Sequence, residues 1–193
     1  MGITGGVGSG KSRVLEILKE EYGFRVIQAD QVAKDLMQPG QESYRAVVDF
    51  LGPSILNEDG TINRPAMAQV IFGCPDKRVQ VDRLTHPLVW NTAFGEALAC
   101  PEPLVVIEAA IPSKEFRDNC GEMWYVYTSR ENRMERLRES RGYTQEKTES
   151  IMDSQAQEAG FREFSDAVID NNGSVEDTRK QIRRLLKNKI RMQ

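Results

Sequence analysis

The chain has 193 residues, 39% of them hydrophobic and 28% charged, and is expected to bury a proper core as one domain. Its formal net charge of −3 argues against nonspecific nucleic-acid binding, which requires a strongly basic balance. No apolar run approaches the length of a membrane span, and the start of the chain does not resemble a secretion signal. We therefore expect a cytoplasmic protein with neither nucleic acid nor membrane as a partner.

Three cysteines, Cys74, Cys100 and Cys120, are widely spaced and odd in number. This pattern is typical of free thiols in a reducing compartment rather than of a disulfide framework. Because the chain has no C-x-x-C pair and a single histidine, a cysteine-based metal site is not expected. The expected state is a monomer or a weak homo-oligomer.

The first predicted strand, Met1–Thr4, leads directly into a glycine-rich segment. This segment, Gly5–Ser12, fits G-x-x-x-x-G-K-[ST] at every fixed position. A loop of this kind wraps backbone N–H groups around nucleotide phosphates, and its glycines permit close approach and positive φ. Lys11 is expected to reach the β- and γ-phosphates and the Ser12 hydroxyl to ligate Mg²⁺. The helix that follows points its positive dipole end at the same anion.

The surroundings of this segment favour a nucleotide site over an ordinary glycine-rich turn. Apolar residues of Arg13–Glu21 recur at helical spacing, Tyr22 and Gly23 end that helix, and Phe24–Gln28 follows as a second strand. Strand, loop, helix and strand in this order are what the motif requires. A dinucleotide fingerprint is excluded, because Lys11 stands where its last glycine would be.

Residues 30–101 contain helical patterns and no convincing strand. The expected helices are Gln31–Met37, Glu42–Leu51, Pro65–Phe72, Asp76–Leu84 and Leu88–Ala99. We interpret this stretch as an all-helical insertion over the carboxyl ends of the strands, where open α/β sheets bind their ligands. Three further strands are expected at Leu104–Glu108, Met123–Tyr127 and Ala167–Asp170.

This rhythm predicts an α/β fold in three layers, with helices on both faces of a mostly parallel five-stranded sheet. The core comprises residues 1–29, 102–128 and 166–193, and an excursion rich in arginine and glutamate comprises residues 129–165. The final segment, Val175–Arg191, predicts a helix whose apolar face carries Ile182, Leu185, Leu186 and Ile190. Its basic face is interpreted as solvated, with an RNA or membrane contact as the alternative.

Two carboxylates near strand ends are candidates for phosphoryl-transfer chemistry, which needs positioning, charge neutralisation and an acceptor for a proton. Asp30 follows the second strand and suits the role of this general base, of a Mg²⁺ ligand, or of the N-cap of the next helix. Glu108 ends the third strand, and both a structural and a functional role remain open for it.

The excursion carries arginines suited to bidentate phosphate contact, namely Arg130, Arg133, Arg136, Arg138, Arg141 and Arg162. Most are expected to face solvent as partners of nearby glutamates on a helix. Arg141 stands where that helix would give way to a mobile lid and is the strongest functional candidate. The only histidine lies in Thr85-His86-Pro87, a pattern typical of a helix start.

Taken together, these segments resemble the dephospho-CoA kinase family over nearly the whole chain. The resemblance rests on the phosphate loop, on Asp30 with the helix after it, and on Thr85-His86-Pro87. Segments in the excursion, including Gln155, and the turn Ile169–Ser174 are also similar to the family.

The resemblance implies transfer of the ATP γ-phosphoryl group to the ribose 3′-hydroxyl of dephospho-CoA, the last step of coenzyme A synthesis, with Mg²⁺. It implies a P-loop kinase core, a helical domain at residues 30–101 that receives the CoA moiety, and a lid over ATP at residues 129–165. Lys11 and Asp30 are then the catalytic residues. The implied ATP contacts are Gly6, Gly8, Ser9, Gly10, Lys11, Ser12, Arg13, Arg141 and Arg162, with Asn171 beside adenine. The implied acceptor contacts are Thr4, Asp30, Thr85 and His86.

Some positions differ from the family's pattern. Gln28 stands where an aspartate is common, and Arg13 replaces a frequent threonine. The segment Ala109–Glu115 lacks the usual leucine pair followed by glutamate. Two alternatives remain: a P-loop kinase for another nucleoside or small-metabolite acceptor, and a nucleotide-binding regulator without transfer activity.

Overall fold

The computed structural model describes residues 1–190, with side chains as far as Lys187. The chain divides into two compact units, Met1–Val26 with Cys100–Gln193 and Ile27–Ala99. We call them the sheet unit and the helical unit. Within residues 1–190, no helix combines the length and the apolar character needed to cross a membrane.

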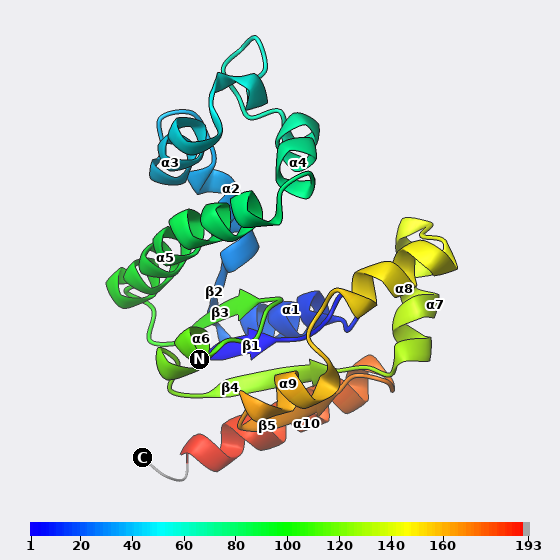
Figure 1. The fold of residues 1–193 in the computed structure, drawn as a ribbon. Coiled ribbons are helices and arrows are strands. Elements are labelled where there is room, and N and C mark those ends of the chain that lie inside the picture. The colour runs from blue at the N-terminus through cyan, green and yellow to red at the C-terminus, as the bar shows by residue number, and fades with distance from the viewer. Residues whose placement is uncertain (191–193) are drawn as a thin grey trace. The chain divides into compact units, whose positions relative to one another are not determined.

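A five-stranded sheet forms the centre of the sheet unit (Figure 1). Its strands are β1 (Gly2–Thr4), β2 (Arg25–Gln28), β3 (Val105–Ala109), β4 (Met123–Tyr127) and β5 (Ala167–Asp170). Their order is β2-β3-β1-β4-β5, and β1 pairs in parallel with β3 and β4, as β4 does with β5. The five predicted strands are confirmed, because short apolar runs between helical patterns are typical of buried parallel strands.

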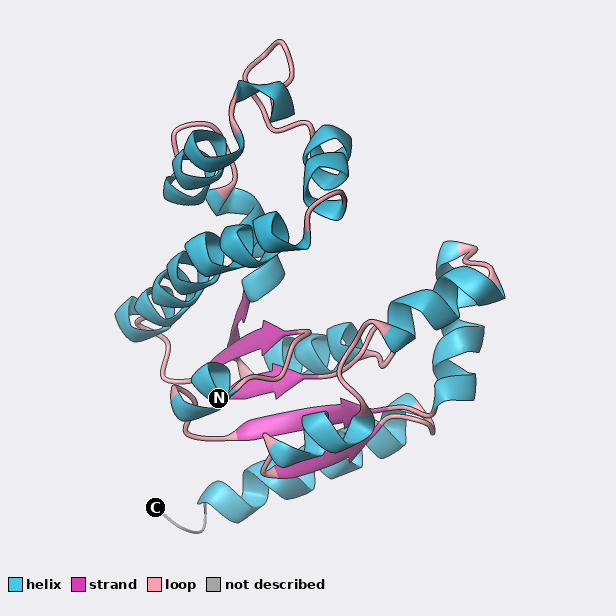
Figure 2. Ribbon diagram, viewed as in Figure 1, coloured by secondary structure: helices cyan, strands magenta, loops and turns pink. Residues whose placement is uncertain are grey.

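Helices cover both faces of this sheet (Figure 2). The helices of the sheet unit are α1 (Lys11–Tyr22), α6 (Lys114–Asp118), α7 (Arg130–Arg141), α8 (Gln145–Asp153), α9 (Glu158–Glu163) and α10 (Val175–Ile190), of which α7 and α8 project away from the sheet. Helices α1 and α10 share one core with the sheet, whereas Phe161 of α9 stacks on Tyr125 of β4 with ring centroids 5.0 Å apart. The predicted three-layer α/β class is thereby confirmed.

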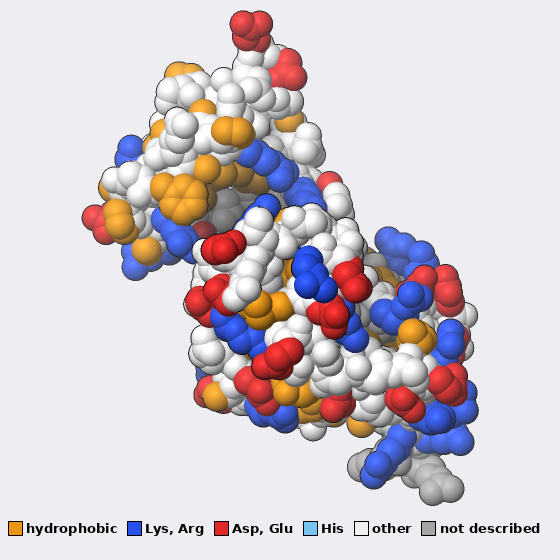
Figure 3. Space-filling model, turned by 90° about the vertical axis from the view of Figure 1, so that its right-hand side faces the viewer, with side chains coloured by type: hydrophobic (Ala, Val, Ile, Leu, Met, Phe, Trp, Pro, Cys, Tyr) orange, Lys and Arg blue, Asp and Glu red, His pale blue; other side chains and the backbone are white. Residues whose placement is uncertain are grey.

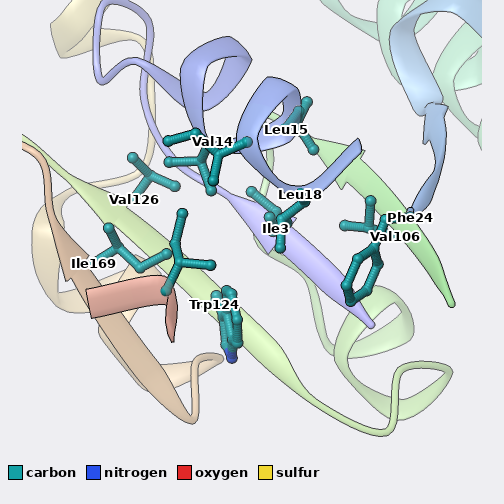
Figure 4. Close-up of a cluster of buried hydrophobic side chains, with 11 residues drawn as sticks. Ile3, Val14, Leu15, Leu18, Phe24, Val106, Trp124, Val126 and Ile169 are labelled. Carbon is teal, nitrogen blue, oxygen red and sulfur yellow. The ribbon is translucent and has the colours of Figure 1, made fainter. Parts of the chain in front are cut away.

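The core on the α1 face is built from side chains that alternate along the strands. Figure 4 shows Ile3, Trp124 and Val126 on the sheet beneath Val14 and Leu18 of α1, all fully buried. The predicted apolar face of α10 joins this core through Ile182, Leu185 and Leu186. The predicted end at Arg191 and the side chain of Ile190 lie outside the described part of the chain.

The helical unit has its own small core of Val47, Ile55 and Val81. Its elements are α2 (Ala29–Leu36), α3 (Glu42–Leu51), a 3₁₀ turn (Pro53–Ile55), α4 (Arg64–Phe72) and α5 (Pro75–Ala99). On the face drawn in Figure 3, basic and acidic side chains are interspersed, in keeping with 26 Lys and Arg against 29 Asp and Glu.

The prediction of two helices over residues 76–99 is wrong, because α5 runs unbroken through Pro87. A proline inside a helix costs about 3 kcal/mol or more. Buried Val81, Val89 and Ala93 lie on both sides of it at helical spacing, and α5 packs against α2, α3 and α4. This packing offsets the local cost, which the local sequence pattern does not reveal.

We expect Leu18→Ala to lower the free energy of unfolding by about 2–5 kcal/mol, because Leu18 is fully buried between α1 and the sheet. Chemical denaturation measures this change. The matched variant Leu98→Ala changes a helical leucine that is 89% exposed and should stay within about 0.5 kcal/mol of wild type. Equal losses in the two variants would contradict this assignment of the core.

Candidate functional site

The glycine-rich loop lies between β1, which ends at Thr4, and α1, which begins at Lys11. Gly8 and Gly10 have φ of 76° and 87°, so the positive φ expected from the sequence is observed at both. A Cβ on Gly10 would lie 2.1 Å from Asn171 Nδ2. Gly10 is also the N-cap of α1, so the helix begins with its free N–H groups at the loop.

Lys11 folds back over the beginning of the loop. Its Nζ donates to Gly5 O at 2.6 Å and to Gly6 O at 3.4 Å, and it lies 3.6 Å from Glu108 Oε1. Glu108 is buried at the end of β3, where Lys11 compensates its charge. The sequence left the role of Glu108 open, and the structure gives it a contact: its carboxylate orients the lysine of the loop.

Buried side chains brace the loop from beneath. Ser9 O accepts hydrogen bonds from Thr128 Oγ1 at 2.9 Å and from Asn171 Nδ2 at 2.8 Å. Thr178 Oγ1 donates to Asn171 Oδ1 at 2.8 Å, which fixes the orientation of the amide. Asn171 is buried, and these contacts give its side chain a supporting role; its expected position beside adenine stays a prediction.

Two side chains of the excursion form hydrogen bonds with the backbone of the loop at Val7. Arg133 Nε donates to Val7 O at 2.8 Å, and Val7 N donates to Gln155 Oε1 at 3.0 Å. Arg133 Nη2 also donates to Gln155 Oε1 at 3.0 Å. Burial lowers the pKa of Arg133, although the guanidinium stays charged.

Arg133 and Arg136 are therefore not solvent-facing partners of glutamates, and that expectation is wrong for them. Arg136 Nη2 donates to Asn171 O at 2.7 Å. The expectation holds for Arg138, which lies 3.8 Å from Glu135. Leu137 is the buried residue of α7, and it lies on one helix face with Arg133 and Arg136, which precede it at the i, i+3, i+4 spacing.

The two arginines favoured from the sequence lie elsewhere in the excursion. Arg141 is exposed at the end of α7, with its Cζ 5.8 Å from the Tyr143 ring centroid. Arg162 pairs with Glu158 at 2.7 Å and lies 5.5 Å from the Tyr127 ring centroid. Their expected contacts with the nucleotide stay predictions.

Other predicted ligands sit around the loop with differing exposure. Ser12 and Arg13 are exposed in the first turn of α1, and Arg13 pairs with Glu16 at 2.6 Å. Thr4 is fully buried at the end of β1, and its Oγ1 has no hydrogen-bond partner among the described residues. A buried hydroxyl without a partner is uncommon and favours a site that a polar ligand completes.

Asp30, Thr85 and His86 belong to the helical unit. The prediction of Asp30 as the N-cap of the next helix is wrong. The N-cap of α2 is Gln28, and Asp30 is an exposed residue of the first turn. The helix-start interpretation of Thr85-His86-Pro87 is also wrong, since Thr85 Oγ1 donates to Val81 O at 2.8 Å within α5. Exposed His86 lies 3.9 Å from Asp82, one turn earlier.

The helical unit contains a cavity of about 330 Å³ between α2 and α4. It is lined by Ala33, Lys34, Met37, Gln38, Thr61, Ile62, Arg64 and Met67. Its wall is thus apolar with two cations, and neither Lys34 nor Arg64 forms an ion pair with a residue in the described range. This chemistry suits a ligand that combines an anionic group with an apolar part.

A phosphate loop between β1 and α1 of a parallel sheet, with a lysine at its end, defines the P-loop class of nucleotide-binding proteins. Solved structures share the fold. TT1252 from Thermus thermophilus aligns with a TM-score of 0.80 and 25% identity over 97% of this chain and 95% of that one. Shikimate kinase from Acinetobacter baumannii aligns with a TM-score of 0.55 and 15% identity over 97% and 93%.

The family model of dephospho-CoA kinase matches residues 1–177. A dephospho-CoA kinase of Streptococcus mutans is 35% identical over 185 residues, which cover 94% of this chain and 93% of the relative. Another from Corynebacterium efficiens is 36% identical over 190 residues, covering 96% and 94%. The chain belongs to the dephospho-CoA kinase family, the kinases of the last step of coenzyme A biosynthesis, which confirms the family and activity predicted from the sequence.

We expect Gly10→Ala to weaken ADP binding on the order of tenfold or more, because its Cβ would meet Asn171 at a positive φ. Isothermal titration calorimetry measures the affinity. The control Gly60→Ala changes a glycine with φ of 78° and nothing within 4 Å of a Cβ. It should cost about 1–2 kcal/mol of stability and leave ADP affinity unchanged. Wild-type affinity in Gly10→Ala would refute this role of the loop.

Proposed function

We propose that the chain transfers the γ-phosphoryl group of ATP to the ribose 3′-hydroxyl of dephospho-CoA, with Lys11 and Asp30 as catalytic residues. The binding of ATP, the phosphoryl donor, rests on the position of Lys11. Its ammonium lies 2.6 Å from Gly5 O, in the loop that directly precedes helix α1. A cation and free helix N–H groups directed at one concave loop are what a triphosphate requires.

In this proposal, the backbone of the loop binds the phosphates of ATP through Gly6, Gly8, Ser9, Gly10 and Lys11. The nucleotide site is completed by Ser12, Arg13, Arg141, Arg162 and Asn171, and α7 to α9 form the lid. Asp30 accepts the proton of the 3′-hydroxyl as its oxygen forms a bond to the γ-phosphorus. The bond from that phosphorus to the β–γ bridging oxygen breaks, and ADP leaves. Thr4, Thr85 and His86 contact the acceptor.

The residues beside the loop also suit Mg²⁺. Ser12 offers an exposed hydroxyl and Glu108 a carboxylate, and Mg²⁺ prefers few protein oxygens together with waters and phosphate oxygens. In the part of the chain that the structure describes, no cluster of three His, Cys, Asp or Glu side chains offers a separate metal site. When bound, the ion neutralises charge on the phosphates, with Ser12 as its protein ligand.

We assign the acceptor's remote half to the cavity of the helical unit. Dephospho-CoA carries a diphosphate and a pantetheine arm, so it combines anionic groups, amides and an apolar chain. The cavity offers Lys34 and Arg64 for the anionic groups. The side chains of Met37, Ile62 and Met67 suit the apolar chain. Recognition of a long acceptor by groups remote from the reacting hydroxyl helps to orient that hydroxyl.

The remaining features of the proposal concern setting and partners. ATP and dephospho-CoA are the small-molecule partners of a cytoplasmic enzyme that is a monomer or a weak homo-oligomer. Cys74, Cys100 and Cys120 are free thiols in the structure, in keeping with a reducing compartment. Burial raises the pKa of Cys120, so that its reactive thiolate is disfavoured.

The decisive experiment incubates the protein with ATP, Mg²⁺ and a panel of hydroxyl acceptors and measures product masses. A phosphorylated dephospho-CoA with an equal amount of ADP is expected. Transfer only to another acceptor would favour the other-kinase alternative. Thermal stabilisation by ATP without ADP release would favour a regulator that binds nucleotide and transfers nothing.

We expect Asp30→Asn to lower kcat by about 10²–10⁴-fold, because an amide does not accept the hydroxyl proton. Steady-state kinetics measures kcat, and calorimetry should find ATP affinity largely unchanged. Asp35→Asn is the matched control, since Asp35 is an exposed carboxylate on the same helix that accepts from Gln31. Wild-type turnover in Asp30→Asn would leave the residue without a catalytic role.

Ala33→Leu is expected to raise KM for dephospho-CoA by about 10–200-fold by filling the cavity, with KM for ATP unchanged. Leucine keeps the helix propensity of this position in α2. Ala99→Leu makes the same change at an exposed residue of the helical unit and should leave both constants unaltered. An unaltered KM in folded Ala33→Leu would remove the cavity from the acceptor site.

A further inference from the structure

The guanidinium of Arg133 lies against the phosphate loop. Beyond its hydrogen bonds to Val7 O and Gln155 Oε1, it fills the space where a side chain at position 6 would begin. A Cβ on Gly6 would come within 2.4 Å of Nη2, 2.7 Å of Cζ and 3.0 Å of Nη1. Arg133 thus touches the loop itself rather than solvent beside it.

The charge of Arg133 has no acidic partner in the described residues, and both of its hydrogen-bond acceptors are neutral. Other arginines of the excursion differ, because Arg130 pairs with Asp153 at 3.0 Å and Arg162 with Glu158 at 2.7 Å. A half-buried cation is costly unless an anion compensates it. This position therefore favours an anionic ligand.

A second cation contacts the same part of the loop. Lys11 Nζ lies 3.4 Å from Gly6 O, while the Arg133 guanidinium covers the Cα of Gly6. Glu108 compensates Lys11, so one unbalanced positive charge remains there. Since the lysine of this motif binds the β- and γ-phosphates, the guanidinium at Gly6 and Val7 contacts the loop that holds the same phosphates.

We infer that Arg133 is a catalytic arginine of this kinase, which neutralises negative charge on the γ-phosphoryl group during its transfer. This inference rests on the proposed binding of ATP at the loop. Three of the five guanidinium N–H groups remain for phosphate oxygens after the contacts to Val7 and Gln155. Gln155 is a positioning residue, since its Oε1 joins Arg133 Nη2 to the N–H of Val7.

The test compares Arg133→Gln, Arg133→Lys and Arg138→Gln, the last removing an exposed charge from the same helix. We expect Arg133→Gln to lower kcat by about 10²–10³-fold, as for other lost donors to a transition state. Its affinity for ADP should stay within about threefold of wild type. Mg²⁺, ADP and aluminium fluoride together form a transition-state analogue, which the wild type should bind more tightly than ADP alone. Arg133→Gln should lose this difference in affinity. Arg133→Lys should recover part of kcat, and Arg138→Gln should behave as wild type.

Gln155→Glu leaves Arg133 in place and puts a carboxylate where Gln155 Oε1 lies, 3.0 Å from Arg133 Nη2. We expect a lower kcat with an unreduced melting temperature, because the new ion pair withdraws the charge from the phosphates. Wild-type kcat in Arg133→Gln would overturn the inference. A fall in kcat matched by an equal fall in ADP affinity would also do so, since it would indicate loop support alone. Absence of transfer to dephospho-CoA by the wild type would instead refute the proposed acceptor, because analogue binding needs no acceptor.

Discussion

The carbonyl oxygen of Ser9 is the point on which the phosphate loop rests. Two buried donors, Thr128 Oγ1 and Asn171 Nδ2, bind it from the residues that follow β4 and β5. A buried polar group left unpaired costs about 1–3 kcal/mol, so this carbonyl must remain bonded for the loop to keep its conformation. Asn171 is in turn held by Thr178 at the start of α10. The loop is therefore supported by segments more than a hundred residues away in the chain.

The same loop concentrates positive charge. The N-terminus of α1, Lys11 and Arg133 all face it, and Glu108 is the carboxylate that contacts Lys11. Burial of the Arg133 guanidinium without an acidic partner among the described residues raises the free energy of the protein. An anion that compensates this charge binds more tightly for that reason. Part of the affinity for a triphosphate is thus prepared in the fold before the nucleotide arrives.

The strands, the loop and the apolar face of α10 could be predicted because each depends on local periodicity or on a short motif. Pro87 predicts a helix boundary that does not exist, because a proline is a local signal, whereas the continuity of α5 depends on packing at Val81, Val89 and Ala93. The boundary at Asp30 was misplaced because α2 begins at once after β2, with Gln28 as its cap.

The site was less predictable than the fold. Arg133 and Arg136 sit among glutamates on a strongly polar helix, and charged helical residues usually face solvent. Arg133 and Arg136 share the i, i+3, i+4 face of α7 with Leu137, which lies against Gly8 of the loop, whereas Arg138 lies off that face. That contact joins residues over a hundred positions apart, and no local pattern contains it.

The contact between Gly6 and Arg133 also bears on how such a sequence can change. A side chain at position 6 would collide with the guanidinium, and a shorter residue at position 133 would leave Gly6 uncovered. Because the guanidinium is the far end of a flexible side chain, such a substitution moves the arginine rather than the loop. The single missing Cβ at position 6 therefore decides how closely this cation can approach the phosphate loop.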